Sequence, residues 1–219
     1  MRSKKLMSTY DTWSGFYDGF DNPLIPVEET AVHALLQTIA CERVLDAAAG
    51  TGRYALALAR QGKQVAAVDC NAKMLSKAQE KAAREGLQIE FRLDDLAALS
   101  FPDGTFDLVL CALALAHVKD LLGAYREFQR VLRPGGHLIT SDLHPELQRQ
   151  LGPRHRWELV AGEAPVFFPN YHASLDDYRS AMDRAGFQTR AVLELPLQIG
   201  ERLTPGALVL WGCKPGTGA

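Results

Sequence analysis

The sequence contains few cysteines and no long hydrophobic run. Its 219 residues include four cysteines, which stand far apart and lack the Cys-x-x-Cys or Cys/His spacing of a metal site. No segment approaches the roughly 20 apolar residues of a membrane-spanning helix. The basic N-terminus, MRSKKLMSTY, lacks the apolar core of a signal peptide. We therefore expect a cytoplasmic protein with reduced thiols, no bound metal and no membrane span.

The sequence also lacks an excess of charge of either sign. Lysine and arginine together number 24 and aspartate and glutamate 26, for a net charge of -2. This balance argues against a protein that binds nucleic acid by neutralising many phosphates. Hydrophobic residues make up 47% and charged residues 23% of the chain, as in globular proteins with a full core. The length predicts a single domain, residues 1–219, as a monomer or homodimer.

Short apolar segments alternate with helical patterns along most of the chain. The strand candidates are residues 43–47, 64–69, 89–93, 106–114 and 137–142, and the helices between them are 53–61, 71–86 and 121–136. Such alternation predicts a parallel sheet with right-handed crossovers. Residues 188–197 and 206–214 are separated by a short polar turn, which predicts an antiparallel pair. We expect an α/β fold with a Rossmann-like, doubly wound, mostly parallel seven-stranded sheet and a C-terminal antiparallel strand pair.

Two segments fall outside this alternation. Residues 1–40 are expected to form an N-terminal helical cover. Residues 143–173 are rich in proline and break the pattern, so we expect a loop-rich insertion that covers a bound ligand. Four aromatic side chains of this insertion either line an apolar pocket or pack the insertion onto the sheet: Trp157, Phe167, Phe168 and Tyr171.

The stretch RVLDAAAGTGRYALALA, residues 43–59, carries the turn after the first strand. Ligands of doubly wound sheets bind beside the carboxyl ends of strands. Gly50 and Gly52 allow positive φ, and GTGRYA satisfies a loose dinucleotide fingerprint. Asp46, at the end of the strand, opposes a pyrophosphate but suits an ammonium group. S-adenosylmethionine is a nucleoside with such a group and no phosphate, and we predict it as the cofactor.

Further acidic residues follow the next two strands. Asp69 ends the second strand, where a carboxylate accepts hydrogen bonds from both ribose hydroxyls. Asp95, in the loop after the third strand, is a candidate to accept from the adenine amino group, with Asp94 as its neighbouring alternative. Met74, one turn into the next helix, either lies against the adenine or fills the core. Together these residues predict a nucleoside site along one edge of the sheet.

Five motifs follow one another in an order that resembles the class I S-adenosylmethionine-dependent methyltransferases. The motifs are VLDAAAGTG, VDCNAKML, DLAALSFPDGTFDLVLC, REFQRVLRPGGHLI and LDDYRSAMDRAGF, within residues 10–191. The resemblance is to the small-molecule group that includes the ubiquinone/menaquinone methyltransferases (methyltransferase type 11). It implies transfer of the methyl group of S-adenosylmethionine to a small-molecule acceptor by in-line displacement. The loop-rich insertion of residues 143–173 is then expected to cover this acceptor.

The resemblance also implies a set of cofactor contacts. By position in the motifs they are Asp46, Ala48, Gly50, Gly52, Asp69, Asp95, Leu96 and Cys111, and Tyr17 in the segment FYDGF is implied as well. Among these, the amide of Leu96 is implied to donate to an adenine ring nitrogen, and Tyr17 to close over the cofactor from an N-terminal helix. Ala48 departs from the family pattern, which usually has glycine there, so its Cβ must fit under the methionine moiety.

Three histidines are candidates for a catalytic base, because an imidazole has an ordinary pKa near 6.5. His117 and His144 lie near predicted strand ends, and His172 lies at the end of the insertion. The alternative roles are a helix cap or loop contact for His117, a turn residue for His144 and a surface residue for His172. Because methyl transfer depends mainly on positioning the acceptor, a fixed base is optional.

Other functions remain as alternatives at this point. A nicotinamide-dependent oxidoreductase is disfavoured by Asp46 and by the lack of a recognisable Tyr-x-x-x-Lys motif. A methyltransferase that acts on bases or amide side chains is disfavoured because CALALAH stands where an Asn/Asp-Pro-Pro-Tyr motif is expected. A non-catalytic binding module is disfavoured because the cofactor motifs are intact. The sequence leaves open the acceptor and whether oxygen, nitrogen, carbon or sulfur is methylated.

Overall fold

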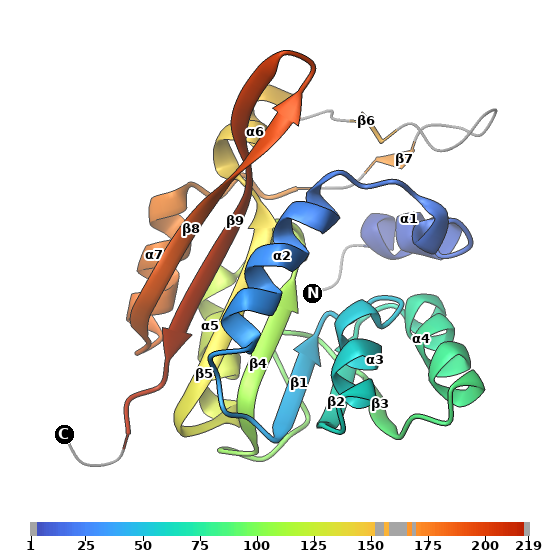
Figure 1. The fold of residues 1–219 in the computed structure, drawn as a ribbon, viewed down its shortest axis with the longest axis vertical. Coiled ribbons are helices and arrows are strands. Elements are labelled where there is room, and N and C mark those ends of the chain that lie inside the picture. Colours follow the sequence, from blue (N-terminus) through green and yellow to red (C-terminus); the bar gives the residue numbers. More distant parts are fainter. Residues whose placement is uncertain (1–3, 152–155, 158–165, 168–169, 217–219) are drawn as a thin grey trace.

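A seven-stranded sheet with the order β3-β2-β1-β4-β5-β9-β8 forms the centre of the fold (Figure 1). The structure is a computed structural model, and it describes residues 4–151, 156–157, 166–167 and 170–216. The sheet strands are β1 (Arg43–Ala47), β2 (Gln64–Asp69), β3 (Ile89–Leu93), β4 (Phe106–Ala112), β5 (Leu132–Leu143), β8 (Gln188–Ile199) and β9 (Arg202–Cys213). The first five run parallel, whereas β9 pairs antiparallel with both β5 and β8. This topology confirms the predicted fold.

The strand order reverses between β1 and β4. From β1 the chain moves outward to β2 and β3, then returns to place β4 on the other side of β1. The carboxyl ends of β1 and β4 therefore diverge toward helices on opposite faces, and this divergence opens a crevice.

Helices cover both faces of the sheet (Figure 1). On one face lie α2 (Leu24–Leu36), α3 (Arg53–Arg60) and α4 (Ala72–Arg84), and on the other lie α5 (Leu121–Val131) and α7 (Leu175–Arg184). The remaining elements are α1 (Lys4–Trp13), η1 (Tyr17–Gly19), η2 (Leu115–His117), α6 (Pro145–Leu151), β6 (Arg156–Trp157) and β7 (Val166–Phe167). α1 lies on the side of the sheet toward which β1 points (Figure 1). None of the helices in the described part of the chain is long and apolar enough to cross a membrane.

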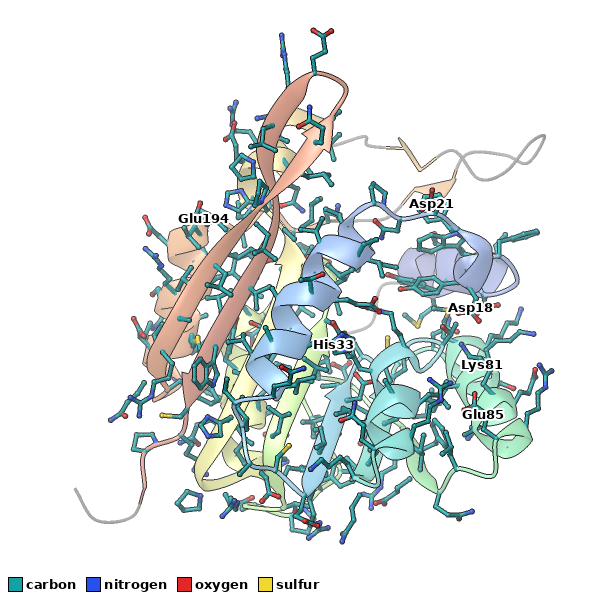
Figure 2. All side chains as sticks on the ribbon, viewed as in Figure 1. Asp18, Asp21, His33, Lys81, Glu85 and Glu194 are labelled. Carbon is teal, nitrogen blue, oxygen red and sulfur yellow. The ribbon has the colours of Figure 1, made fainter. Side chains whose placement is uncertain are left out.

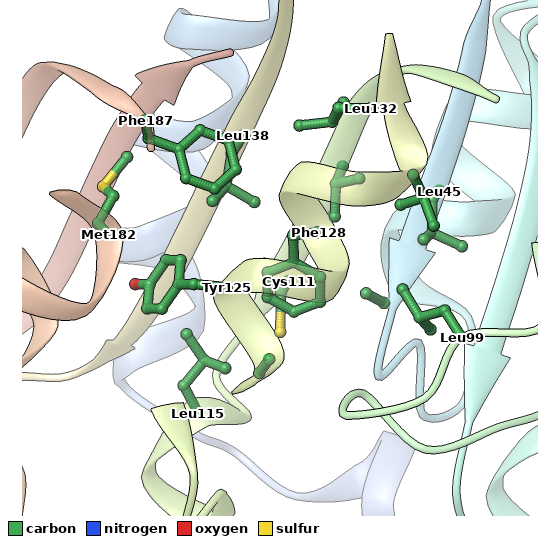
Figure 3. Packing of buried hydrophobic residues seen from close by; sticks show 14 of the residues in the cluster. Leu45, Leu99, Cys111, Leu115, Tyr125, Phe128, Leu132, Leu138, Met182 and Phe187 are labelled. Atoms are coloured by element: carbon green, nitrogen blue, oxygen red, sulfur yellow. The ribbon is translucent and has the colours of Figure 1, made fainter. Parts of the chain in front are cut away.

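Two apolar layers hold the helices to the sheet. Strand β4 contributes to both, because its four consecutive residues 108–111 are completely buried, as expected for a central parallel strand. Tyr125, Phe128 and Met182 pack between the sheet and helices α5 and α7, as Figure 3 shows. The opposite layer lies beneath α2 and α3. Together the layers fix the strand ends from which the candidate site projects.

The observed element ends show where local chemistry modifies the sequence pattern. β4 stops at Ala112, two residues earlier than predicted, because Leu113 adopts a left-handed conformation with a φ of 54°. The predicted insertion begins with helix α6 rather than a loop; Pro145 suits a first helical position and Glu146 lies in the first turn. Two helix starts are fixed by side-chain caps: Asn71 caps α4, and Ser174 forms a capping box at α7.

Candidate active site

A cavity of about 770 Å³ lies at the carboxyl ends of β1, β2 and β4. Its walls come from four parts of the chain: the turns after β1 and β2, the loop after β3, the segment after β4, and the N-terminal residues of α1 and η1. The volume lies in the range of small-molecule pockets, about 300–1,000 Å³. The cavity coincides with the crevice that the strand order creates.

The turn after β1 forms the floor of this cavity. Ala48 and Gly50 both line it, and both have left-handed φ values, 64° and 55°. A left-handed conformation costs a residue with a Cβ about 1–2 kcal/mol, so Ala48 is strained where the family pattern has glycine. Ala49 N–H donates to Val68 O at 2.8 Å, which holds the turn against β2. A strained residue on the cavity wall is typical of functional sites.

Asp69 connects the two turns and lines the cavity. Its Oδ2 accepts from Gly50 N at 2.8 Å, and its Oδ1 accepts from Asn71 N at 2.8 Å. Because a carboxylate offers about four lone-pair sites, this orientation is compatible with further hydrogen bonds from a ribose. The backbone of both turns thus presents Asp69 to a ligand in a defined direction.

Asp46 lies behind the turn and does not line the cavity. It is 2% exposed, and its Oδ2 accepts from Ala55 N, in the first turn of α3, at 2.8 Å. Burial raises the pKa of Asp46 to about 7, although the Ala55 hydrogen bond and the Arg53 charge act in the opposite direction. Asp46 is thus placed at the start of α3, behind the cavity floor, and its contact with the ammonium group of a ligand stays a prediction.

Gly52 also lies away from the cavity lining, at the start of α3. Its φ is 88°, and a Cβ placed on it would lie 2.9 Å from Cβ of Ala78 in α4. The residue therefore serves the close packing of α3 against α4, whereas the sequence predicted a cofactor contact.

The loop after β3 separates the two adjacent carboxylates. Asp95 lines the cavity together with Leu96, and its Oδ1 accepts from Ala97 N at 3.1 Å. Asp94 does not line it; its Oδ2 accepts from Ser100 N at 3.0 Å and from Ser100 Oγ at 2.7 Å. Asp94 therefore holds the loop and Asp95 faces the cavity. Met74 lines the same region and is itself 2% exposed, so it is both cavity wall and core.

The N-terminal segment contributes Met7, Tyr10 and Tyr17 to the cavity wall. Trp13 packs edge-on against Tyr17, with ring centroids 4.9 Å apart. Burial raises the pKa of both cavity tyrosines, which keeps their hydroxyl groups neutral. This aromatic cover reduces the access of water to the site.

The segment after β4 also lines the cavity, and β4 lies on the other side of β1 from the strands that precede Asp69 and Asp95. His117 lines the cavity, and its ring packs edge-on against Tyr10 with centroids 5.8 Å apart. Ala116 in the same turn is held on both sides: its N–H donates to Asp142 Oδ2 at 2.5 Å, and its carbonyl accepts from Tyr171 N at 2.7 Å. Tyr171 also lines the cavity. The position of His117 is thus defined by β5 and by the end of the insertion.

Other predicted site residues lie away from the cavity. Cys111 is completely buried in the layer beneath α5 and does not line it. His144 is 5% exposed; its Nε2 lies 2.9 Å from Glu194 Oε2, and its Nδ1 accepts from Glu146 N. Such contacts fit the alternative role of a turn residue. His172 is exposed and does not line the cavity. The side chains of Trp157, Phe167 and Phe168 lie outside the described residues.

Sequence reasoning missed several residues of the lining. Cys70 directly follows Asp69, and Lys119 and Asp120 follow the predicted β4 segment, so position along the chain would have indicated all three. Met7 and Tyr10 reach the site from about sixty residues away along the chain, and neither belongs to a motif. No local pattern signals such a contact.

The sequence and its fold have clear relatives among known proteins. Residues 45–140 match the family described as a methyltransferase domain. Over 166 residues the chain is 33% identical to a ubiquinone biosynthesis O-methyltransferase of Methylocella silvestris, with 74% of this chain and 65% of the relative covered. Residues 45–140 of the chain form a domain of the class I S-adenosylmethionine-dependent methyltransferases. Over 117 residues the chain is 39% identical to a demethylmenaquinone methyltransferase of Thermus thermophilus, with 52% of this chain and 53% of the relative covered.

Solved structures share the fold of this methyltransferase. An S-adenosylmethionine-dependent methyltransferase from Mesorhizobium loti superposes with a TM-score of 0.71 at 23% identity, covering 86% of this chain and 98% of the other. A methyltransferase from Methanosarcina mazei superposes with a TM-score of 0.70 at 20% identity, covering 83% and 97%. By contrast, the chain spans 65% and 53% of the two curated relatives. Members of the family use S-adenosylmethionine.

The packing role of Gly52 predicts a difference between two glycine substitutions. Gly52→Ala and Gly62→Ala each place a Cβ on a residue with positive φ, but nothing lies within 4 Å of the position at Gly62. We expect Gly62→Ala to cost about 1–2 kcal/mol of unfolding free energy. Gly52→Ala should cost about 1–3 kcal/mol more because of the contact with Ala78. Chemical denaturation of both variants measures the difference, and equal losses would contradict the packing role.

Asp142 predicts a pH-dependent stability change. Burial raises its pKa to about 7, against an ordinary value of about 3.9. The folded protein therefore binds this proton more tightly than the unfolded chain, and its stability falls as pH rises from about 4 to about 7. Relative to wild type, we expect Asp142→Asn to gain about 2–4 kcal/mol of unfolding free energy between about pH 4 and about pH 8.

Denaturant unfolding of the cofactor-free protein at both pH values measures this gain. The matched control is Asp177→Asn, because hydrogen bonds from Ser174 lower the pKa of Asp177. Asp177 stabilises the fold above its unfolded-state pKa and loses that effect as pH falls, so its variant should change in the opposite direction. A pH-independent difference for Asp142→Asn is the contradicting result.

Proposed function

We propose that the chain transfers the methyl group of S-adenosylmethionine to a small-molecule acceptor. The observation that carries this proposal is that one cavity is lined by Asp69 and Asp95, which follow β2 and β3 on one side of β1, and by His117, which follows β4 on the other side of β1. The two carboxylates are the hydrogen-bond acceptors that a nucleoside requires. The residues after β4 are the ones that we assign to the acceptor of the methyl group.

The residues that follow β2 and β3 suit the nucleoside part of the cofactor. Asp69 is oriented for ribose hydroxyls by two backbone amides, and Asp95 and Leu96 lie on the loop beside it. The first turn of α3 already donates Ala55 N–H to the buried Asp46. A pyrophosphate needs free amides at such a helix start and no adjacent carboxylate. This arrangement supports S-adenosylmethionine over a dinucleotide.

The chemistry requires placement of the acceptor more than activation. Bound S-adenosylmethionine supplies a methyl group on a positively charged sulfur, which is already a good leaving group. The chain's contribution is to orient the acceptor in line and to limit access of water, through the N-terminal tyrosines and the segment after β4. The imidazole of His117 is the group that we assign to accept a proton from an acceptor hydroxyl or amine.

A small acceptor with an apolar body suits the part of the cavity that is formed by the segment after β4 and by Tyr171. Leu113, Val118 and Tyr171 are its apolar lining, and Lys119 and Asp120 add charged groups. The two curated relatives are named for ubiquinone biosynthesis and for demethylmenaquinone. Their names support acceptors of low molecular mass for this chain.

The cofactor proposal predicts a specific binding profile in calorimetric titration. S-adenosylmethionine and S-adenosylhomocysteine should bind, and NAD should not. Asp95→Ala should weaken S-adenosylmethionine binding by about tenfold or more, as expected for loss of a hydrogen bond to a charged group. Asp94→Ala is the matched control: it removes the bonds to Ser100, so it should lower the melting temperature with a smaller loss of affinity. Binding of NAD alone would overturn the proposed cofactor.

The acceptor proposal predicts turnover with one class of substrate. We expect S-adenosylhomocysteine to be released when the protein is incubated with S-adenosylmethionine and the small-molecule fraction of a cell extract. The protein and RNA fractions of the same extract should give none. His117→Gln should slow this release by about 100-fold, within the usual range for loss of a general base, while cofactor affinity is retained. His172→Gln, outside the cavity lining, is its control and should react normally.

A further inference from the structure

Asn71 sits at the junction of the cofactor turns and helix α4. It is 3% exposed and follows Asp69 by two residues. Its backbone N–H donates to Asp69 Oδ1 at 2.8 Å, and its side-chain Oδ1 accepts from Met74 N at 2.9 Å. One residue thus orients the ribose-facing carboxylate and caps the helix that carries Met74.

The amide nitrogen of the same side chain contacts helix α1. Asn71 Nδ2 donates to Asp11 Oδ1 at 2.8 Å and to Met7 O at 3.3 Å. Met7 and Tyr10, on this helix, line the cavity, whereas Asp11 does not. The contact therefore ties a cavity wall directly to the turn that presents Asp69.

A second polar contact fastens the other end of the N-terminal segment. Asp18 Oδ1 accepts from Thr51 Oγ1 at 2.6 Å, and its Oδ2 accepts from Lys81 Nζ at 2.9 Å. Figure 2 shows Asp18 on this segment above Lys81 of α4. Thr51 lies between the two glycines of the first cofactor turn. Residues 7–20 are thus anchored at both ends to the turns after β1 and β2, which carry the predicted cofactor contacts. We call these residues the N-terminal cover from here on.

We propose that Asn71 is a positioning residue that holds the N-terminal cover closed over bound S-adenosylmethionine and so limits the rate at which cofactor and product leave. The inference rests on the proposed function, because it assigns the cofactor to this cavity. The role needs both halves of the amide: the oxygen caps α4, and the NH₂ group donates to Asp11 and Met7. Serine also caps a helix, but it has no amide to reach α1.

Asn71→Ser separates these two halves. Because serine retains the cap, we expect little change in the melting temperature of the cofactor-free protein. Loss of both hydrogen bonds to α1 should speed dissociation of S-adenosylhomocysteine about fivefold or more, and most of the effect is expected from the shorter bond, the one to Asp11. Amide hydrogen exchange in residues 7–20 should also accelerate, while exchange in β1 and β4 stays unchanged. Stopped-flow displacement and exchange measured by mass spectrometry give the two readouts.

Asp11→Ala removes the shorter of the two hydrogen bonds from the other partner, leaves the bond to the Met7 carbonyl, and does not change a residue of the cofactor turns. We expect it to reproduce most of the faster dissociation, and Asn71→Ser in that background should add little more. Asn71→Ala is a further comparison that also loses the cap, so it should lower the melting temperature. If both single variants leave dissociation and exchange at the wild-type rates, the inference is overturned and the proposed function stands. If the wild-type protein binds neither S-adenosylmethionine nor S-adenosylhomocysteine, the proposed function fails, and the inference fails with it.

Discussion

The hydrogen bonds of the Asp69 carboxylate organise the site more than any other interaction. One oxygen binds the backbone of the β1 turn and the other binds the backbone of the β2 turn, so two crossovers meet at a single side chain. Each bond joins a charged acceptor to a backbone donor, which makes it stronger than a neutral pair. The left-handed Ala48 and Gly50 are part of the geometry that allows the first of these bonds. The shape of the cavity floor therefore depends on Asp69 as much as its chemistry does.

Electrostatics around the cavity favour a ligand that carries positive charge. Asp69 and Asp95 line one side, and Asp46 and Asp142 are buried behind the lining. Burial raises the pKa of both buried carboxyls to about 7. A cationic ligand stabilises their ionised forms and so lowers these pKa values again. Binding and protonation are thereby linked, and the same acids that destabilise the cofactor-free fold at higher pH favour a sulfonium and an ammonium in the cavity.

The sequence predicts those features that follow from strand topology. Asp69 and Asp95 were identified because they stand after consecutive strands, and parallel strands deliver such residues to one edge of a sheet. The direction in which a side chain points from a turn is not encoded in the local sequence. The carboxylate of Asp46 points toward Ala55 N, and the imidazole of His144 pairs with Glu194 from a strand fifty residues later. Tyr10 reaches the cavity only through tertiary packing, which no periodic pattern specifies.

Helix α2 and the N-terminal cover that precedes it are held to the rest of the structure with very different strength. Glu28 of α2 is completely buried and bonds to Ser141, Tyr54 and Arg53, which joins α2 to β5 and α3. Removing one partner from a buried charged network costs about 3–5 kcal/mol. The cover is instead tied at one end by Asp18, whose side chain is half exposed, and such exposed pairs contribute about 0–1 kcal/mol. Because the Glu28 network fixes α2 to the sheet, the opening of the N-terminal cover that we propose requires movement only of residues that precede α2. The burial of one glutamate thus sets the boundary between the cover and the helix that follows it.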